Sequence, residues 1–168
     1  MKKILSLTLA LAMSGTILTG CGSKNGASEA PAENSTKQTA PVQQEQSQTE
    51  KALALINTFA TGDTDTARSL LADGYIQHNL AYGTGADAFI GSVEYLASAD
   101  VKTTVNNIRA FEDGDKVFLQ TIYNFAGAGE QVAFDIFRFD ENGKIAEHWD
   151  VMETIADQST WQNQNGKF

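Results

Sequence analysis

Three ionisable side chains lie among apolar neighbours near the end of the chain. Asp135 lies inside the apolar run Phe134–Phe139, and His148 and Asp150 lie in the next such run. Alternate residues of a β-strand point to the same side, so His148 and Asp150 are expected to share one face. A carboxylate among apolar side chains is costly unless it is hydrogen-bonded or protonated. Asp135 therefore predicts that this part of the chain forms the wall of a polar pocket.

Both runs belong to a predicted β-hairpin that covers residues 133–153. Its turn, Asp140–Gly143, contains Asn-Gly, a pair that adopts the positive φ angles of tight turns. A loop of two or four residues places Asp135 on the same face as the histidine and the aspartate of the second strand. A loop of three residues places it with Glu147 and Trp149 instead. The sequence leaves this choice open.

His78 is the other of the two histidines, and it lies in a short extended segment. Its plainest interpretation is a turn histidine that is hydrogen-bonded to the backbone. The carboxylates have plain alternatives as well. Asp135 could pair with Arg109 or Arg138. Asp150 could be a solvated residue near the end of an edge strand.

The sequence contains no G-x-S-x-G, no G-x-G-x-x-G, no H-E-x-x-H and no P-loop. His78, His148 and Asp150 could coordinate zinc or iron, because imidazole and carboxylate groups suit these metals. The ligands of metal sites usually follow one another at short fixed spacings in the sequence, however, and no such ligand pattern supports a metal site here. We therefore predict a site without a metal ion and without a cofactor.

The N-terminus has the features of a bacterial lipoprotein signal. Lys2-Lys3 is followed by the apolar run Ile4–Leu18, a pattern typical of secretory signals. The sequence Leu-Thr-Gly-Cys that ends at Cys21 resembles the lipobox, whose cysteine becomes the lipidated first residue. The apolar run is too short and too often interrupted by polar residues for a transmembrane helix. We predict a signal peptide over residues 1–20 and anchoring on the extracytoplasmic side of a bacterial membrane through acyl chains on Cys21.

Residues 21–49 are predicted to form a disordered linker, because they contain few large apolar side chains and both prolines of the protein. One folded domain is expected over residues 50–168. The protein carries a formal net charge of −9, and from Glu50 onward it has 18 acidic against 8 basic residues. Such an acidic domain repels phosphate backbones, so nucleic acids are not expected as partners.

Three helical patterns precede four strand patterns in the folded part. Thr49 and Asp63 are expected to cap the first two helices, and Gly62 to end the first. A third helix follows the break at Gly83–Gly85, and its apolar stripe includes Tyr95. The predicted strands are Lys102–Phe111, Lys116–Phe125, Gln131–Phe139 and Lys144–Met152. This order indicates an α+β fold in which the helices cover one face of a curved antiparallel sheet of about four strands.

The most specific segments of the chain are Tyr75–Asn79, with the sequence Y-I-Q-H-N, and Gly143–Val151, which contains E-H-W-D-V. They resemble the SnoaL-like polyketide cyclase family of the nuclear-transport-factor-2-like superfamily. The resemblance covers residues 51–154. It implies a cone-shaped α+β barrel, and for the acidic base of the cyclases it implies Asp150 as the best match.

A more distant similarity connects Asp135–Ile145 with the ketosteroid isomerases of the same superfamily. It implies that Asp135 is a protonated oxyanion-hole aspartate and that His78 is the general base. It also implies an even hairpin loop, with three side chains of the last strand inside one cavity: His148, Asp150 and Met152. The oxyanion tyrosine of the isomerases falls near Leu55, which cannot donate a hydrogen bond, so steroid isomerisation is not expected.

These interpretations lead to two hypotheses for the function. The first is a cofactor-free lyase or isomerase, in which His78 or Asp150 removes a proton next to a carbonyl group and the other polar groups bind the developing enolate. The second is a binding module that holds a small apolar or carbonyl-containing molecule without chemistry. The predicted catalytic residues are His78, Asp135, His148 and Asp150, and the predicted ligand-binding residues are Tyr75, Phe137 and Met152.

The outer face of the same hairpin could pair two copies of the domain. It carries Glu147, Trp149 and Val151 at alternate positions. Exposed apolar residues on this face would favour a homodimer.

Overall fold

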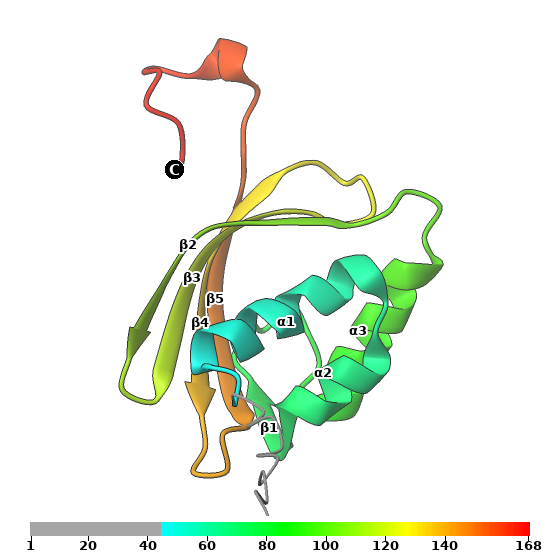
Figure 1. The fold of residues 1–168 in the computed structure, drawn as a ribbon. Coiled ribbons are helices and arrows are strands. Elements are labelled where there is room, and N and C mark those ends of the chain that lie inside the picture. Colours follow the sequence, from blue (N-terminus) through cyan, green and yellow to red (C-terminus); the bar gives the residue numbers. More distant parts are fainter. Residues whose placement is uncertain (1–44) are drawn as a thin grey trace, which may run out of the picture. The chain divides into compact units, whose positions relative to one another are not determined.

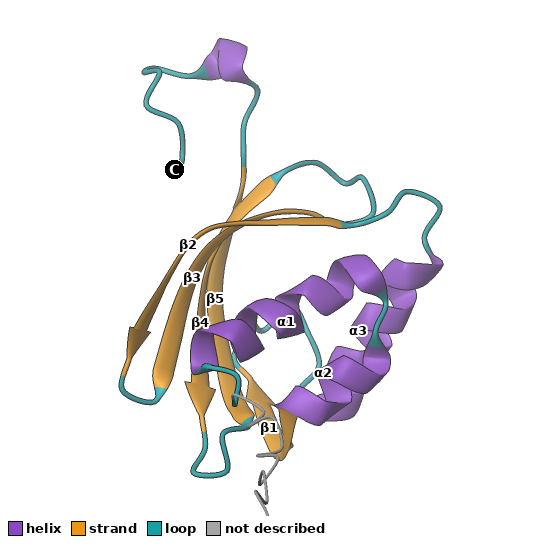
Figure 2. Cartoon of the chain, viewed as in Figure 1, coloured by secondary structure: helices purple, strands orange, loops and turns teal. Residues whose placement is uncertain are grey.

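The structure, a computed structural model, describes residues 45–168 (Figure 1). The predicted signal peptide of residues 1–20, the predicted lipidation site Cys21 and most of the predicted linker of residues 21–49 lie outside the described residues. In chain order the elements are α1 (Gln48–Thr61), α2 (Thr64–Leu70), β1 (Leu71–Gln77), α3 (Ala86–Ser98), β2 (Thr104–Asp113), β3 (Lys116–Asn124), β4 (Gln131–Phe139), β5 (Ile145–Thr154) and the short 3₁₀ helix η1 (Gln158–Thr160). Figure 2 shows that helices α1, α2 and α3 lie on one face of the curved sheet. The helices and the sheet together form the expected α+β cone. None of these helices is long and apolar enough to cross a membrane.

Helix α1 begins earlier than the sequence analysis predicts. Its N-cap is Ser47, not the predicted Thr49. The Ser47 hydroxyl accepts a hydrogen bond from the Glu50 backbone N–H at 3.1 Å, and the Glu50 carboxylate accepts one from the Ser47 N–H at 2.8 Å. This reciprocal capping box satisfies two N–H groups that the first helical turn leaves free. Gly62 ends the helix in the left-handed conformation, as predicted, with φ of 73°.

The sheet has five strands in the order β1-β5-β4-β3-β2. Strands β2 to β5 form the predicted antiparallel meander, whereas β1 adds a parallel strand beside β5. The prediction of about four antiparallel strands is therefore corrected to a mixed five-stranded sheet. Asp73-Gly74, which has the residue types of a turn, lies inside β1 where the pairing register shifts between Leu71 and Ile76. The local turn signal thus appears as an irregularity within a strand.

The pairing of β4 with β5 decides the register that the sequence leaves open. Asp135 lies directly opposite Asp150, and Phe137 lies opposite His148. Near the turn the register shifts between Arg138 and Phe139, so that Ala146 is an extra residue on β5. Beyond this bulge Asp135, His148 and Asp150 share the face of the sheet that the helices cover.

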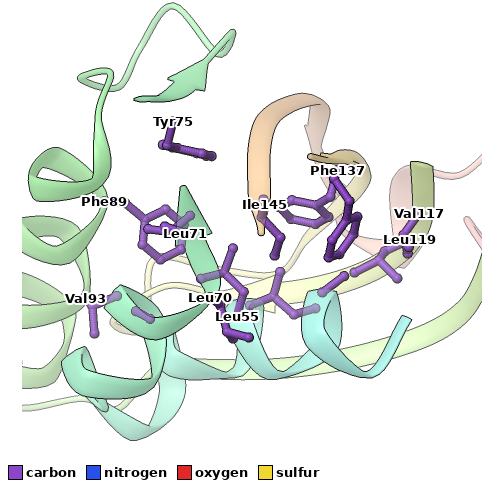
Figure 3. Close-up of a cluster of buried hydrophobic side chains, with 14 of the residues drawn as sticks. Leu55, Leu70, Leu71, Tyr75, Phe89, Val93, Val117, Leu119, Phe137 and Ile145 are labelled. Carbon is purple, nitrogen blue, oxygen red and sulfur yellow. The ribbon is translucent and has the colours of Figure 1, made fainter. Parts of the chain in front are cut away.

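The hydrophobic core fills the space between the helices and this inner face. Figure 3 shows side chains of α1, α2, α3, β1 and the inner face of the sheet meeting in one cluster. Fully buried members include Leu55, Val93, Leu119 and Ile145. Tyr95, in contrast, is 73% exposed, so its predicted place in the buried stripe of α3 is wrong.

The outer face of the sheet carries a row of apolar side chains that crosses four strands. The strand registers place Phe111 beside Phe118, Phe118 beside Ile136, and Ile136 beside Trp149. Val151, on the same face, is 72% exposed. The C-terminal segment reaches one end of this face, where the Gln120 side chain donates to the backbone oxygen of Lys167 at 2.7 Å. The homodimer through this face stays a prediction.

We expect Gly62→Ala to destabilise the domain. An alanine there must adopt the left-handed conformation, and its Cβ would lie 2.8 Å from the Ala97 Cβ of α3. Strain of this kind costs about 1–3 kcal/mol. Urea unfolding of the variant and the wild type measures the difference.

Gly91→Ala is the matched control. Gly91 lies inside α3, and an added Cβ there would meet no heavy atom within 4 Å. Replacing a mid-helix glycine stabilises by roughly 0.5–1 kcal/mol. A Gly62→Ala variant as stable as the wild type would contradict the close packing of α1 against α3.

Candidate functional site

A pocket of about 650 Å³ opens between the helices and the inner face of the sheet. Its apolar wall includes Ile56 and Phe59 of α1, Phe89 of α3, Met152 of β5, and Phe125, which directly follows β3. Its polar wall consists of Gln77, Tyr123, Asp135, His148 and Asp150. The pocket is therefore largely apolar, with a compact group of polar side chains at the sheet, the usual make-up of a small-molecule site.

Asp135, His148 and Asp150 form the centre of the polar wall. One ligating atom from each of the three lies within 4.8 Å of the others. The opposite positions of the two aspartates in the register, and the i, i+2 spacing on β5, bring them together. One atom from each could also bind a single metal ion, since imidazole and carboxylate are suitable ligands. The absence of a metal from the working site stays a prediction.

The Asp135 carboxyl is only 3% exposed and is hydrogen-bonded through both of its oxygens. The Tyr123 hydroxyl donates to Oδ2 at 2.9 Å, and Oδ1 lies 3.2 Å from His148 Nε2. Burial first, and the neighbouring Asp135 second, raise the pKa of Tyr123 well above its ordinary value, so this hydroxyl stays a donor. Neither Arg109 nor Arg138 forms an ion pair with Asp135 among the described residues.

Sequence reasoning missed Tyr123. In the register of β3 and β4 the small side chains of Thr121 and Ala133 lie between Tyr123 and Asp135, which leaves room for the phenol ring to reach the carboxyl. A tyrosine four residues after the inner-face residue Leu119, which pairs with Asp135, is the signal that could have identified it.

The protonation of His148 follows from its second neighbour, Gln77. His148 Nδ1 lies 3.1 Å from Gln77 Oε1. The orientation of this amide is set by two further bonds, because Oε1 accepts from the Asn79 N–H at 2.9 Å and Nε2 donates to the Tyr75 hydroxyl at 3.3 Å. An acceptor next to Nδ1 requires a proton on Nδ1. The contact between His148 Nε2 and Asp135 then holds one shared proton, on either the imidazole or the carboxyl.

Asp150 is half-buried, and its carboxylate lines the pocket. The Asn79 side-chain amide donates to Oδ1 at 2.6 Å, and Asn79 is itself held by the Ala81 N–H, which donates to its Oδ1 at 2.9 Å. Burial raises the pKa of Asp150, His148 opposes this shift, and Asp135 adds to it. A carboxylate with a raised pKa inside a pocket is suited to accept a proton.

His78 does not join this group, and the prediction that it shares the pocket is wrong. Its backbone N–H donates to the His148 oxygen at 2.9 Å, which continues the pairing of β1 with β5. Strand alternation then turns Gln77 and Asn79 inward and His78 outward. The His78 ring stacks on Trp149 with centroids 4.5 Å apart, and its Nε2 lies 3.0 Å from the Glu147 carboxylate.

On the outer face of the sheet Arg138 also donates hydrogen bonds to the Glu147 carboxylate. The hydrogen bonds from His78 and Arg138 lower the pKa of Glu147 below its ordinary value. Arg138 is thus occupied on the outer face.

The three predicted ligand-binding residues differ in position. Phe137 and Met152 line the pocket, and the Phe137 ring stacks on His148 with centroids 4.4 Å apart. Tyr75 is buried in the core instead, edge-on to Phe89 at 6.1 Å, and is not among the pocket-lining residues. Burial raises the pKa of the Tyr75 hydroxyl. This hydroxyl accepts the hydrogen bond that the Gln77 amide donates.

A protein-family model, described as SnoaL-like domain, matches residues 52–148. The match spans more than half of the chain and ends at His148, just before Asp150. Among curated proteins none matches the chain.

Several solved structures share the fold. An NTF2-like protein of unknown function from Cytophaga hutchinsonii superposes with a TM-score of 0.57 at 16% identity, covering 66% of this chain and 94% of that one. A candidate polyketide cyclase from Bacillus cereus gives 0.54 at 15% identity, covering 63% and 74%. An LEH-like epoxide hydrolase from M. tuberculosis gives 0.54 at 18% identity, covering 61% and 80%. At these identities the similarity establishes the fold.

The hydrogen-bond network predicts the tautomer of His148. In a His78→Gln variant His148 is the only histidine of the protein, which has two. We expect its ¹⁵N NMR spectrum to show a protonated Nδ1 at every pH at which the domain is folded, because Gln77 Oε1 accepts that proton. Gln77→Leu in the same background removes the acceptor, so the Nε2–H tautomer should then appear. A bare Nδ1 with Gln77 present would contradict this network.

Proposed function

Since this chain belongs to the family of SnoaL-like domains, we propose that its pocket binds a small, largely apolar molecule with a carbonyl group and removes a proton next to that carbonyl without a cofactor. The observation that carries the proposal is the convergence of a carboxylate and a proton-sharing pair at one wall of an otherwise apolar pocket. Proton abstraction needs a base on the carbon side and a hydrogen-bond donor on the oxygen side.

Asp150 is the base in this proposal. It lines the pocket, and the bond from Asn79 to Oδ1 holds the carboxylate in one orientation. Its raised pKa brings its basicity closer to that of the enolate it must generate. His78, which the sequence analysis also proposed as the base, faces away from the pocket and is given no role in the reaction.

The pair Asp135–His148 is the donor on the oxygen side. The shared proton bridges His148 Nε2 and Asp135 Oδ1, and it bonds to the substrate oxygen, which becomes negative as the C–H bond breaks, by leaving its acceptor within the pair. Tyr123 and Gln77 hold the two members of the pair from opposite ends. The low dielectric of the site strengthens this new bond to the developing negative charge, and the only reorganisation is the change of acceptor by one proton.

Two proteins of the same fold are named as a candidate polyketide cyclase and an LEH-like epoxide hydrolase. Both names describe reactions of small organic molecules. The second candidate function is binding without chemistry, and it is favoured by the predominance of apolar side chains, such as Phe59, Phe125 and Met152, over polar ones in the lining.

Hydrogen–deuterium exchange at the α-carbon tests the reaction without knowledge of the natural substrate. A panel of β-keto compounds is incubated with the protein in D₂O and followed by ¹H NMR. We expect Asp150→Asn to lower the rate of exchange by about 100- to 10,000-fold, the usual contribution of a general base. Since burial raises the pKa of Asp150 and only its ionised form accepts a proton, the wild-type rate should fall as the pH drops through a pKa above that of ordinary aspartate.

His78→Ala is the matched control, because it removes an ionisable group from the neighbouring outer face and should leave exchange unchanged. Equal rates in Asp150→Asn and the wild type would remove the base from the proposal. Thermal stabilisation by a compound that shows no exchange in the wild type would favour the binding function instead.

We also propose that acyl chains on Cys21 tether the domain to a membrane surface, on the strength of the lipobox-like sequence. Stable anchoring needs more than one acyl chain. In a bacterium fed labelled palmitate, the wild-type chain should incorporate the label and sediment with membranes. Cys21→Ala should abolish both, whereas unchanged membrane association without label would point to an uncleaved apolar segment as the anchor.

A further inference from the structure

The pocket is lined by acidic residues without basic ones to balance them. Its acidic lining residues are Asp135 and Asp150, and the lining contains no lysine or arginine. Asp135 is compensated by the proton that it shares with His148. Among the described residues no cationic side chain forms a salt bridge with Asp150, whose one hydrogen bond comes from the neutral amide of Asn79. The pocket thus has one half-buried carboxylate that no lysine or arginine of its lining neutralises, and the neighbouring His148 is already bonded to Asp135.

The remainder of the lining is unusually aromatic. Seven rings contribute to it: Phe59, Tyr82, Phe89, Tyr95, Tyr123, Phe125 and Phe137. Tyr123, which donates to Asp135, stacks on Phe125 with centroids 4.9 Å apart, and Phe59 meets Phe125 edge-on at 5.7 Å. The faces of such rings attract cations, most strongly where water is displaced.

We propose that the pocket takes an organic cation, namely an ammonium group carried on an apolar body. The ammonium lies at Asp150 and the apolar body lies among the rings. Such a ligand supplies the charge that the carboxylate lacks and buries its own charge next to an anion, so neither group is desolvated alone. A ligand with a carboxylate or phosphate head would instead place like charges together.

This inference goes beyond the proposed reaction and does not rest on it. A cation-binding pocket can act as a binding module. If the reaction occurs, an ammonium group next to the reacting C–H makes that proton more acidic, and Asp150 then lies beside both. The proposal about the ligand class and the proposal about the reaction can therefore be disproved independently of each other.

Three probes with one tail and different heads test the ligand class: 4-phenylbutylamine, 4-phenylbutanol and 4-phenylbutyrate. Their affinities for the purified full chain are measured by calorimetry near pH 7.5, with EDTA present so that no metal ion occupies the three ligating atoms. We expect the amine to bind at least about tenfold more tightly than the alcohol, and the carboxylate more weakly than either. Lowering the pH should remove the preference for the amine as Asp150 is protonated.

Asp150→Asn and Glu141→Gln form a matched pair of variants, because each removes one negative charge from the chain. Asp150→Asn should bring the affinity for the amine down to that for the alcohol, and the retained affinity for the alcohol shows that the pocket is intact. Glu141→Gln, in the exposed turn between β4 and β5, should keep the preference.

Three results would overturn the proposal: an amine that binds no better than the alcohol, no measurable binding of the amine, or a preference that survives in Asp150→Asn. If Asp150→Asn fails to fold, the comparison of the three probes on the wild type decides. The α-proton exchange of neutral β-keto compounds is measured separately, so its outcome does not depend on amine binding.

Discussion

The burial of one carboxyl group, that of Asp135, governs the arrangement of the polar wall. An acid with 3% exposure needs a partner for each oxygen, and the structure provides the Tyr123 hydroxyl and His148. His148 needs an acceptor at its other nitrogen, which Gln77 provides, and Gln77 in turn bonds to the Tyr75 hydroxyl. Each requirement leads to the next, so a chain of bonds extends from β3 across β4 and β5 to β1. Loss of one hydrogen bond from this chain would leave a buried polar group unpaired and would lower the stability of the fold by about 1–3 kcal/mol.

The parallel pairing of β1 with β5 connects this chain of bonds to the rest of the site. The backbone bond from His78 to His148 holds the end of β1 against β5 and thereby sets which side chains face inward. Gln77 reaches His148 and Asn79 reaches Asp150, while the histidine between them contacts the outer face. One edge strand thus positions both the proton-sharing pair and the half-buried carboxylate.

Much of the fold could be predicted from the sequence because local signals and tertiary contacts agree. Glycine ends, caps and alternating strands gave the order of the elements, and the i, i+2 spacing put His148 and Asp150 on one face. The register of β4 against β5 depends on the extra residue Ala146, and no residue type in the sequence indicates that a residue is left unpaired there. Strand β1 was expected only as a short extended segment around His78 and not as part of the sheet, because Asp73-Gly74 has the residue types of a turn and the pairing partner is distant in the chain. Tyr123 was missed because a strand tyrosine gives the same pattern whether its hydroxyl meets water or a buried acid.

The bulge at Ala146 determines which side chains of β5 face the pocket. A substitution on this strand changes one side chain and leaves the others on their own sides. Loss of the bulge at unchanged length, with the turn held in place and Ala146 opposite Arg138, would exchange the two sides of the strand and bring Glu147 and Trp149 in while His148 and Asp150 moved out. Deleting Ala146, in contrast, would keep Glu147 opposite Arg138 and His148 opposite Phe137. Related sequences without the bulge should therefore be one residue shorter between the turn and His148, and redesign of the ligand preference is best attempted by exchanging residues within an unaltered backbone frame.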